Sequence, residues 1–301
     1  MTHFIIGASG VIGSALYDNL KSDGQDVVGS RMTQAGNPDL VPLDLRTADL
    51  SNFLSRVSGN DVVYLLAAYS NPSWIFEHKA AAAALNRDGT RRLVDGLRAR
   101  MPHLIFMSSV EVFDGCNGRY VEGDQPNPLN YYGTLKFEIE QHLRASYPRA
   151  TIVRTGWNVG VTPASRCVVR LTYETLLKPQ ARMATDNVFS IIDAKDTAEG
   201  LRRLAGADDV REIHFAADAK LHRDELATLI CQSSRFGSRM DFIPCQFADI
   251  PYSEPRGRLN DLCNDLSKTR LHMQYHSAEG VIRRKVAILD SISHEPVATR
   301  L

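Results

Sequence analysis

The sequence has little that would place the protein against a charged partner or in a membrane. Its 35 basic residues balance 35 acidic ones, so no bulk field draws the chain onto nucleic acid or an anionic membrane. It lacks an apolar run of about 18 residues, the least that a membrane helix requires, and a basic leader followed by an apolar stretch. We therefore expect a cytoplasmic protein that binds neither nucleic acid nor membrane.

The cysteines and histidines form no metal or disulfide pattern. The five cysteines include no CxxC pair, and their odd number leaves at least one without an intramolecular partner, so we expect free thiols. None of the nine histidines belongs to an HxH or HExxH sequence, and a metal site therefore has no support. A chain of 301 residues with 44% hydrophobic residues can form one large domain and a smaller one.

What is present is an alternation of short apolar runs with amphipathic stretches. The runs expected as buried parallel strands are residues 4–6, 27–29, 62–67, 104–107 and 151–153. The helical patterns expected between them are residues 11–20, 50–57, 77–100 and 131–146. This order predicts an α/β fold with a doubly wound parallel sheet of the Rossmann type.

The alternation weakens after Gly156, where prolines divide the chain into shorter pieces. We expect a dinucleotide-binding domain over residues 1–156 and a smaller substrate-binding lobe over residues 157–301. Two further strand candidates, residues 189–192 and 213–216, each precede a helical pattern. The second part is therefore expected to return partly to the sheet.

A glycine-rich turn follows the first strand and opens the first helix, as a dinucleotide fingerprint requires. The first glycine makes the turn, the second admits the pyrophosphate, and the third lets helix and strand pack closely. Helix amides and the helix dipole then bind the phosphates. The residues expected to bind the cofactor here are Gly7, Ser9, Gly10, Val11, Ile12 and Gly13.

The second strand ends at Ser30 and Arg31, where an NAD-binding chain usually has an acidic residue for the ribose. The Arg31 guanidinium can bind a 2′-phosphate, with Ser30 as an additional donor. These residues favour NADP(H) over NAD(H), although a solvated surface arginine is the alternative. Asp44 and Leu45, after the third strand, are expected near the adenine.

Tyr132 and Lys136 lie four residues apart on one face of the helix expected at residues 131–146. A phenol with an ordinary pKa of about 10 exchanges protons poorly near neutral pH. A neighbouring ammonium favours the phenolate, so we expect Lys136 to lower the pKa of Tyr132. Ser108 and Ser109 leave their strand at its carboxyl end, where open α/β sheets bind ligands.

Together these features resemble the extended short-chain dehydrogenase/reductase superfamily and, within it, the dTDP-4-dehydrorhamnose reductase branch. The resemblance is close up to about residue 160 and fainter beyond it. The motifs that carry it are Ser108-Ser109-x-x-Val112-Phe113-Asp114-Gly115, Pro128-Leu129-Asn130-x-Tyr132-Gly133-x-x-Lys136 with Glu140 nearby, Leu85-Asn86-x-x-Gly89-Thr90 and Arg154-Thr155-x-Trp157.

The resemblance implies that Tyr132 is the general acid, that Lys136 binds the nicotinamide ribose and tunes the tyrosine, and that Ser109 polarises the carbonyl. Ser108 is the less favoured catalytic hydroxyl. The residues that it implies along the cofactor are Ala67, Ala68 and Tyr69, with Asn86 ordering the site. The residues that it implies beside the substrate are Ser108, Ser109, Glu111, Tyr132, Arg154 and Trp157.

Three departures from the family pattern concern the expected substrate region. Leu66 replaces a common asparagine, Val110-Glu111 replaces the usual Asp-Tyr, and the loop at residues 71–74 differs. The catalytic class is therefore better defined than the sugar. Arg166 and Arg170 follow the sixth strand and, with Trp157, suit a nucleotide diphosphate, although a core tryptophan and solvated arginines are the alternative.

These features predict an NADPH-dependent reductase of a keto group on a nucleotide-linked deoxysugar. One alternative is a nucleotide-sugar 4-epimerase or dehydratase with tightly bound NAD. Another is a non-catalytic, cofactor-binding regulatory subunit. The alanine-rich run at residues 79–85 suits either core packing or the helix face of a possible homodimer.

Overall fold

The computed structural model describes residues 1–32, 38–47, 49–160, 162 and 165–292. Its largest unit is a sheet of seven strands. They are β1 (Thr2–Ile6), β2 (Asp26–Arg31), β3 (Val41–Pro42), β4 (Val62–Leu65), β5 (His103–Met107), β6 (Ala150–Thr155) and β10 (Glu212–Phe215). Their order is β10-β6-β5-β4-β1-β2-β3, and every neighbouring pair is parallel. The predicted doubly wound parallel sheet is confirmed.

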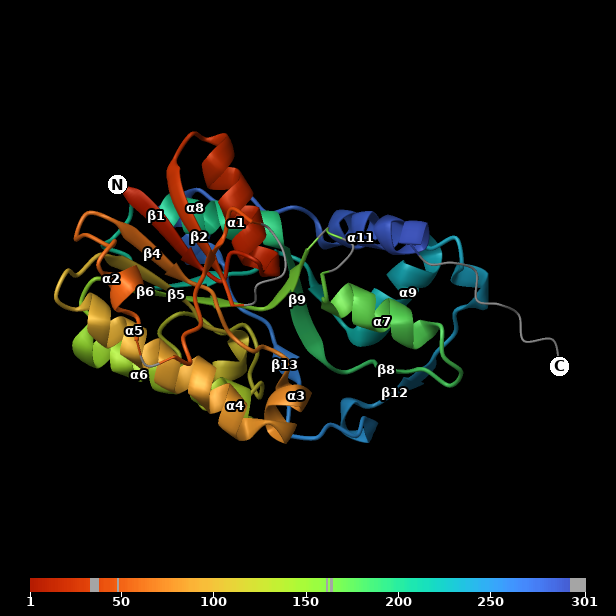
Figure 1. Cartoon of the computed structure of the whole chain (residues 1–301). Coiled ribbons are helices and arrows are strands. Elements are labelled where there is room, and N and C mark those ends of the chain that lie inside the picture. Colours follow the sequence, from red (N-terminus) through yellow and green to blue (C-terminus); the bar gives the residue numbers. More distant parts are fainter. Residues whose placement is uncertain (33–37, 48, 161, 163–164, 293–301) are drawn as a thin grey trace.

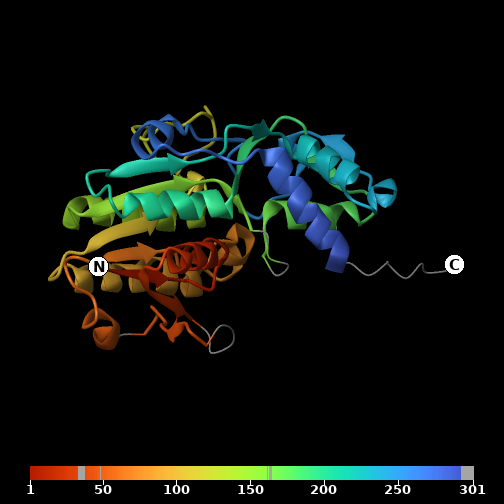
Figure 2. The ribbon, with the colours of Figure 1, turned by 90° about the horizontal axis from the view of Figure 1, so that it is seen from above.

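Helices cover both faces of this sheet (Figures 1 and 2). They are α1 (Val11–Ser22), α2 (Ser51–Leu54), α5 (Thr90–Leu97), α6 (Tyr131–Ser146), α8 (Ala194–Leu204) and α10 (Asp265–Leu271). Two short helices, α3 (Pro72–Glu77) and α4 (Lys79–Ala83), pack on α6 instead. Side chains of α1 and α8 pack on one face, and those of α2, α5 and α6 pack on the other. The central strands are therefore apolar on both sides, which explains their unbroken hydrophobic runs.

The helix predicted at residues 77–100 is interrupted. α3 ends before His78, whose non-helical backbone separates it from α4, and a π-helical turn, η1 (Ala84–Gly89), follows α4 before α5 begins. Such turns are frequent at functional sites. Ala82 and Ala83 pack against Tyr132 in a buried cluster, so the alanine-rich run contributes to the core. The homodimer stays a prediction.

The second part of the chain forms a smaller lobe, on the right in Figure 1. It contains β7 (Trp157–Val159), β8 (Arg182–Ala184), β9 (Val188–Asp193), β11 (Lys220–Leu221), β12 (Ile243–Cys245), β13 (Leu259–Asn260), α7 (Val168–Leu176), α9 (Arg223–Ser233) and α11 (Ala278–Ile292). Strands β7, β11 and β13 pair with β9, and the three helices share a separate core. Short turns η2 (Val110–Val112), η3 (Gly237–Arg239) and η4 (Phe247–Asp249) complete the described elements.

The chain returns to the large sheet after β9, because α8 packs on α1 and β10 pairs with β6. Residues beyond 157 thus belong to both units. All five cysteines are free, as predicted. In the described part of the chain, no helix is long and apolar enough to cross a membrane.

Candidate active site

The glycine-rich turn is too tightly packed for side chains. Gly7 has a φ of +95°, and a Cβ atom there would lie 2.8 Å from the backbone nitrogen of Ala67. A Cβ atom on Gly13 would lie 2.2 Å from the carbonyl oxygen of Gly7, so a larger residue would push α1 away from β1. Gly10 is the N-cap of α1 and borders a cavity. The N-terminus of a twelve-residue helix is thus open to an anionic group.

This cavity, of about 290 Å³, extends from the glycine turn to the carboxyl end of β5. Tyr132 and Lys136 reach it from α6, and Ser109 reaches it from the segment that follows β5. The predicted site residues that line it are Gly7, Gly10, Val11, Ile12, Gly13, Ala68, Ser108, Ser109, Glu111, Tyr132, Lys136 and Trp157. The structure therefore brings the glycine turn and the Ser-Tyr-Lys set to one space, which we call the inner cavity.

Other predicted cofactor residues lie around the inner cavity. Ser9 is exposed on the turn, and Ala67 packs behind Gly7. Asn86 is buried in the π-helical turn, where its side-chain amide donates a hydrogen bond to the carbonyl oxygen of Tyr69 (2.8 Å) and accepts one from its backbone nitrogen (2.9 Å). Asn86 thus fixes the loop after β4 without lining the inner cavity itself.

The end of β2 combines a buried serine with a half-buried arginine. Ser30 lies beneath the glycine turn, where its hydroxyl accepts a hydrogen bond from the backbone nitrogen of Gly7 (3.1 Å). It supports the turn, and its contact with a 2′-phosphate stays a prediction. Arg31 ends the strand beside it and does not line the inner cavity, and its contact with a 2′-phosphate stays a prediction as well.

The residues predicted to meet the adenine are already engaged elsewhere. The Leu45 side chain is 1% exposed and belongs to the core beneath the sheet, so only its backbone is left to meet an adenine, and that contact stays a prediction. The Leu45 carbonyl oxygen accepts a hydrogen bond from Arg92 (2.8 Å). Asp44 forms an ion pair with Arg46 (2.6 Å) and remains partly exposed. Neither residue lines the inner cavity.

Lys136 is almost fully buried, and its Nζ donates a hydrogen bond to the carbonyl oxygen of Met107 (2.7 Å). Nζ lies 5.9 Å from the centre of the Tyr132 ring, as the spacing on one helix face predicts. Burial lowers the pKa of Lys136 to about 8, although the Glu140 carboxylate opposes this shift. The lysine thus changes its charge close to neutral pH.

Tyr132 behaves differently from the sequence-based expectation. Burial raises its pKa above the ordinary value for a phenol, and the nearby Glu111 charge acts in the same direction. A hydrogen bond with Ser109 opposes this shift without cancelling it. The prediction that Lys136 lowers the pKa of Tyr132 is therefore wrong for this structure. Tyr132 therefore keeps its proton at neutral pH and is in the form that can donate it.

Ser108 and Ser109 have different partners although both line the inner cavity. The Ser108 hydroxyl donates a hydrogen bond to Oε1 of the buried Glu140 (2.6 Å). The Ser109 hydroxyl instead bonds with Tyr132 and accepts from the backbone nitrogen of Glu111 (3.2 Å). Ser109 is thus the serine beside the phenol, and its role on a carbonyl stays a prediction.

Arg154 does not border a substrate pocket. It is 1% exposed, and its Nη2 lies 2.8 Å from Oε2 of Glu140, which is 0% exposed. Its guanidinium also lies over the ring of Phe113, at 5.0 Å. The prediction that Arg154 contacts the sugar nucleotide is wrong, because the arginine lines neither the inner cavity nor any other pocket beside it and neutralises a buried carboxylate on α6. Glu140 in turn holds Ser108.

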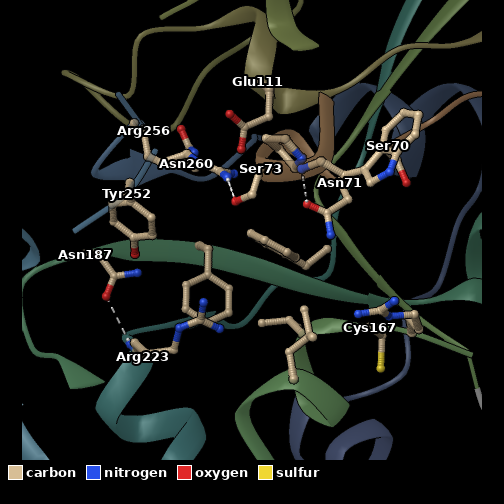
Figure 3. Close-up of a pocket in the computed structure, with 18 of the residues that line it drawn as sticks. Ser70, Asn71, Ser73, Glu111, Cys167, Asn187, Arg223, Tyr252, Arg256 and Asn260 are labelled. Atoms are coloured by element: carbon tan, nitrogen blue, oxygen red, sulfur yellow. Dashed lines mark hydrogen bonds between the residues drawn. The ribbon is translucent and has the colours of Figure 1, made fainter. Parts of the chain in front are cut away.

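A larger cavity of about 890 Å³ opens beside the inner one, between the loop after β4 and the smaller lobe (Figure 3). We call it the outer cavity. The two cavities share the lining residues Ala68, Ser70, Pro72, Glu111, Trp157 and Arg166. A ligand in the outer cavity can therefore reach the Ser-Tyr-Lys set directly.

Three arginines line the outer cavity: Arg166, Arg223 and Arg256. None of them takes part in an ion pair between described residues. Aromatic rings accompany them, since Arg223 lies over Trp157 (5.9 Å) and Arg256 over Tyr252 (5.5 Å). Guanidinium groups that have aromatic planes beside them and no acidic partner among the described residues suit an anionic ligand that carries a ring.

Comparison with known proteins identifies the family. Residues 1–288 match the family described as RmlD substrate binding domain. The chain belongs to this family.

The chain is 32% identical over 150 residues to methionine adenosyltransferase 2 subunit beta of Bos taurus, covering 50% of this chain and 45% of that protein. It is 31% identical over 184 residues to a probable dTDP-4,6-dihydroxy-2-methyloxan-3-one 4-ketoreductase of Streptomyces antibioticus, covering 60% of this chain and 58% of that protein. The chain thus spans about half the length of these curated relatives.

Solved structures share the fold of this RmlD-family chain over nearly its whole length. A dTDP-4-dehydrorhamnose reductase from Clostridium acetobutylicum has a TM-score of 0.83 at 20% identity, covering 96% of this chain and 99% of that one. The same enzyme from Bacillus anthracis, in complex with NADP, has a TM-score of 0.80 at 18% identity, covering 95% and 98%. The smaller lobe is therefore part of the shared architecture.

Sequence reasoning missed two of the arginines that line the outer cavity of this RmlD-family chain. Arg223 and Arg256 lie more than 60 residues beyond the recognised motifs, in the region where the resemblance is faint. Arg170, predicted to contact a diphosphate, instead pairs with Glu174 (2.7 Å) and does not line the outer cavity. A local motif would have been needed to distinguish these arginines, and the sequence has none. Among the described residues, no cluster of acidic, histidine or cysteine side chains could hold a metal ion.

Proposed function

We propose that this RmlD-family protein is an NADPH-dependent reductase of a keto group on a nucleotide-linked deoxysugar. The observation that carries the proposal is the junction of the two cavities. The Ser109, Tyr132 and Lys136 side chains line the inner one, which opens into an outer cavity with three arginines free of ion pairs between described residues. Because the net charge of the whole chain is zero, this group of arginines is a local feature of the cavity and favours an anionic ligand there.

The inner cavity fits a nicotinamide dinucleotide. Gly7 and Gly13 leave no room for side chains, so backbone amides at the start of α1 face the space where a pyrophosphate would bind. The Nζ of Lys136 can hold a ribose hydroxyl next to its bond with Met107. When bound, NADPH supplies the hydride. The relative from Bacillus anthracis, solved with NADP, supports this assignment of the cavity.

Tyr132 and Ser109 act on the carbonyl of the substrate. Ser109 donates a hydrogen bond to the carbonyl oxygen and stabilises the negative charge that develops there. Tyr132 donates its phenolic proton to the same oxygen, and the alcohol product results. The raised pKa of Tyr132 keeps that proton in place until the oxygen becomes basic. Burial of both groups excludes water that would compete for these hydrogen bonds.

The outer cavity would bind the nucleoside diphosphate part of the substrate. Arg223 and Arg256 can each offer paired donors to phosphate oxygens, and Trp157 and Tyr252 offer flat surfaces for a base or sugar. Trp157 lines both cavities. The Streptomyces antibioticus relative, whose name specifies a dTDP-linked ketone, supports this class of substrate.

The proposal is tested by incubating the purified protein with NADPH and dTDP-4-dehydrorhamnose while the NADPH absorbance is followed. We expect that absorbance to fall and the sugar to gain a hydroxyl. Isothermal titration with dTDP and UDP provides a second measurement, with Trp157→Ala as the variant expected to bind more weakly. If no nucleoside diphosphate binds, the substrate lies outside the nucleotide-sugar class, although the oxidoreductase assignment can stand.

Arg31 should determine the choice between NADPH and NADH. A bidentate guanidinium–phosphate contact contributes about 1.5 to 3 kcal/mol, or roughly 10- to 100-fold in affinity. We expect Arg31→Ala to weaken NADPH binding by that factor and to leave NADH binding unchanged. Titration of both cofactors measures the difference, and Arg46→Ala, which removes the partner of Asp44, is the control. Equal losses for both cofactors would rule out the assignment.

The lowered pKa of Lys136 should set an alkaline limit to activity. The ammonium loses its proton as the pH rises through about 8, while Tyr132 retains its own. We expect kcat/KM to fall above that pH and Lys136→Met to abolish the fall, at a lower rate and with weaker NADPH binding. In the unfolded chain the pKa of this lysine is 10.5, so between about pH 8 and pH 10.5 the unfolded state binds more protons than the folded state. The contribution of Lys136 to the free energy of unfolding therefore increases as the pH rises through this range. An alkaline limb that persists in Lys136→Met would contradict the assignment.

A second candidate is a non-catalytic subunit of another enzyme. The relative from Bos taurus, which is named as a subunit, favours it. Turnover of NADPH with a keto sugar would exclude this candidate. The 4-epimerase or dehydratase alternative requires a tightly held oxidised cofactor, so a purified protein whose absorbance spectrum shows no bound nucleotide would argue against it.

A further inference from the structure

Glu111 occupies the junction between the inner and outer cavities. It is the only acidic side chain among the described residues that line either cavity. The residue is 8% exposed, and its carbonyl oxygen packs against Gly133, where a Cβ atom would come within 2.0 Å. This close approach fixes Glu111 against the first turn of α6, next to Tyr132.

One oxygen of the Glu111 carboxylate is held and the other is available. Oε2 accepts a hydrogen bond from the side-chain amide of Asn130 (2.6 Å). Asn130 is itself fixed, because it caps α6 by accepting from the backbone nitrogen of Gly133 (2.9 Å). Among the described residues, no hydrogen bond is made to Oε1 and no arginine pairs with the carboxylate. Figure 3 shows Glu111 at the same end of the outer cavity as Arg256 and Asn260.

A carboxylate in this position requires a particular kind of partner. An ionised carboxylate only accepts hydrogen bonds, so it cannot bind a keto oxygen or a phosphate, which are acceptors too. A hydroxyl group is the donor that a sugar can offer. The backbone nitrogen of Glu111 bonds the Ser109 hydroxyl (3.2 Å), so a sugar hydroxyl that reaches the carboxylate lies in the part of the substrate near the reacting carbonyl.

We propose that Glu111 determines substrate specificity by accepting, through Oε1, a hydrogen bond from the hydroxyl on the carbon next to the keto group. The inference rests on the proposed reductase function and adds to it. A site built to bond a hydroxyl strongly rejects the analogue that lacks it, because the buried acceptor then loses water without gaining a partner. The enzyme would therefore discriminate against a substrate that lacks the hydroxyl on that carbon.

The test compares dTDP-4-dehydrorhamnose with its 3-deoxy analogue, which lacks the hydroxyl beside the keto carbon. We expect the wild type to prefer the hydroxylated substrate by about 10- to 100-fold in kcat/KM, the range for a bond to a charged acceptor. Glu111→Gln should reduce this ratio about tenfold, and Glu111→Met should bring it close to one. The ratio of two substrates in one variant does not depend on how much protein is folded.

Asn260→Ala is the matched control. Asn260 is 6% exposed, lines only the outer cavity, and its Oδ1 has no hydrogen-bond partner among the described residues. We expect this variant to lose kcat/KM equally on both substrates, so the ratio stays that of the wild type. A ratio near one in the wild type, or an unchanged ratio in both Glu111 variants, overturns the inference while the reductase function stands. No reduction of either substrate by the wild type overturns the proposed function itself.

Discussion

Replacing Tyr132 with phenylalanine should lower kcat at least 100-fold and leave NADPH affinity nearly unchanged. A positioned general acid contributes about 10²- to 10⁴-fold to the rate, and the hydroxyl removed here acts on the substrate carbonyl. The ring itself stays packed against Ala82 and Ala83, so the fold is expected to persist. Steady-state turnover with the keto sugar and titration with NADPH measure the two effects separately.

Tyr131→Phe provides the matched control for this variant. Tyr131 is the neighbouring residue on α6, its ring lies 5.5 Å from the Nζ of Lys79, and it lines neither cavity. Loss of the Tyr131 hydroxyl should change kcat less than threefold, which is about the effect of a weak surface interaction. Near-normal turnover in Tyr132→Phe would show that the proton comes from another group.

Breaking the buried ion pair beneath the active site should have the largest effect on stability. Arg154→Met is expected to lower the free energy of unfolding by about 3 to 5 kcal/mol, because it leaves the buried Glu140 carboxylate without its main counter-charge. Both partners are at most 1% exposed, so water cannot replace the guanidinium. Urea unfolding followed by circular dichroism measures the change.

Two further variants test the cause of this destabilisation. Arg283→Met removes an exposed ion pair with Glu279 on α11 and should cost at most about 0.5 kcal/mol. In the double variant Arg154→Met/Glu140→Gln the charge left unpaired is also removed, so the loss should be smaller than in Arg154→Met alone. If Arg154→Met and Arg283→Met have the same free energy of unfolding, the buried ion pair does not stabilise the fold as predicted.

The sequence predicted the fold and the centre of the site because both depend on short spacings. The spacing at which apolar residues recur distinguishes strands from helices. The helix predicted at residues 131–146 has the bounds of α6. Tyr132 and Lys136 share a face because they are four residues apart in one helix. Gly7 and Gly13 flank a single strand–helix turn. Each of these features is set within fewer than about twenty consecutive residues.

Other features depend on residues that are distant in the chain, and only the tertiary structure decided them. Arg154 reads in the sequence as a cation free to meet a substrate, yet Glu140 on another element reaches it inside the core. The pKa of Tyr132 rises because the structure buries the phenol, and its hydrogen bond with Ser109 does not cancel that effect.

The set of residues that lines the outer cavity also depends on the tertiary structure. Arg223 begins α9, Arg256 lies near β13, and Glu111 follows β5, so no local pattern relates them. The return of the chain through α8 and β10 brings the smaller lobe to the carboxyl ends of the strands. The sequence alone therefore determined the architecture and the shared helix face of Tyr132 and Lys136, whose spacings are local. The tertiary structure decided which charges are buried, paired or open to a substrate, because a side chain's environment is supplied by distant segments.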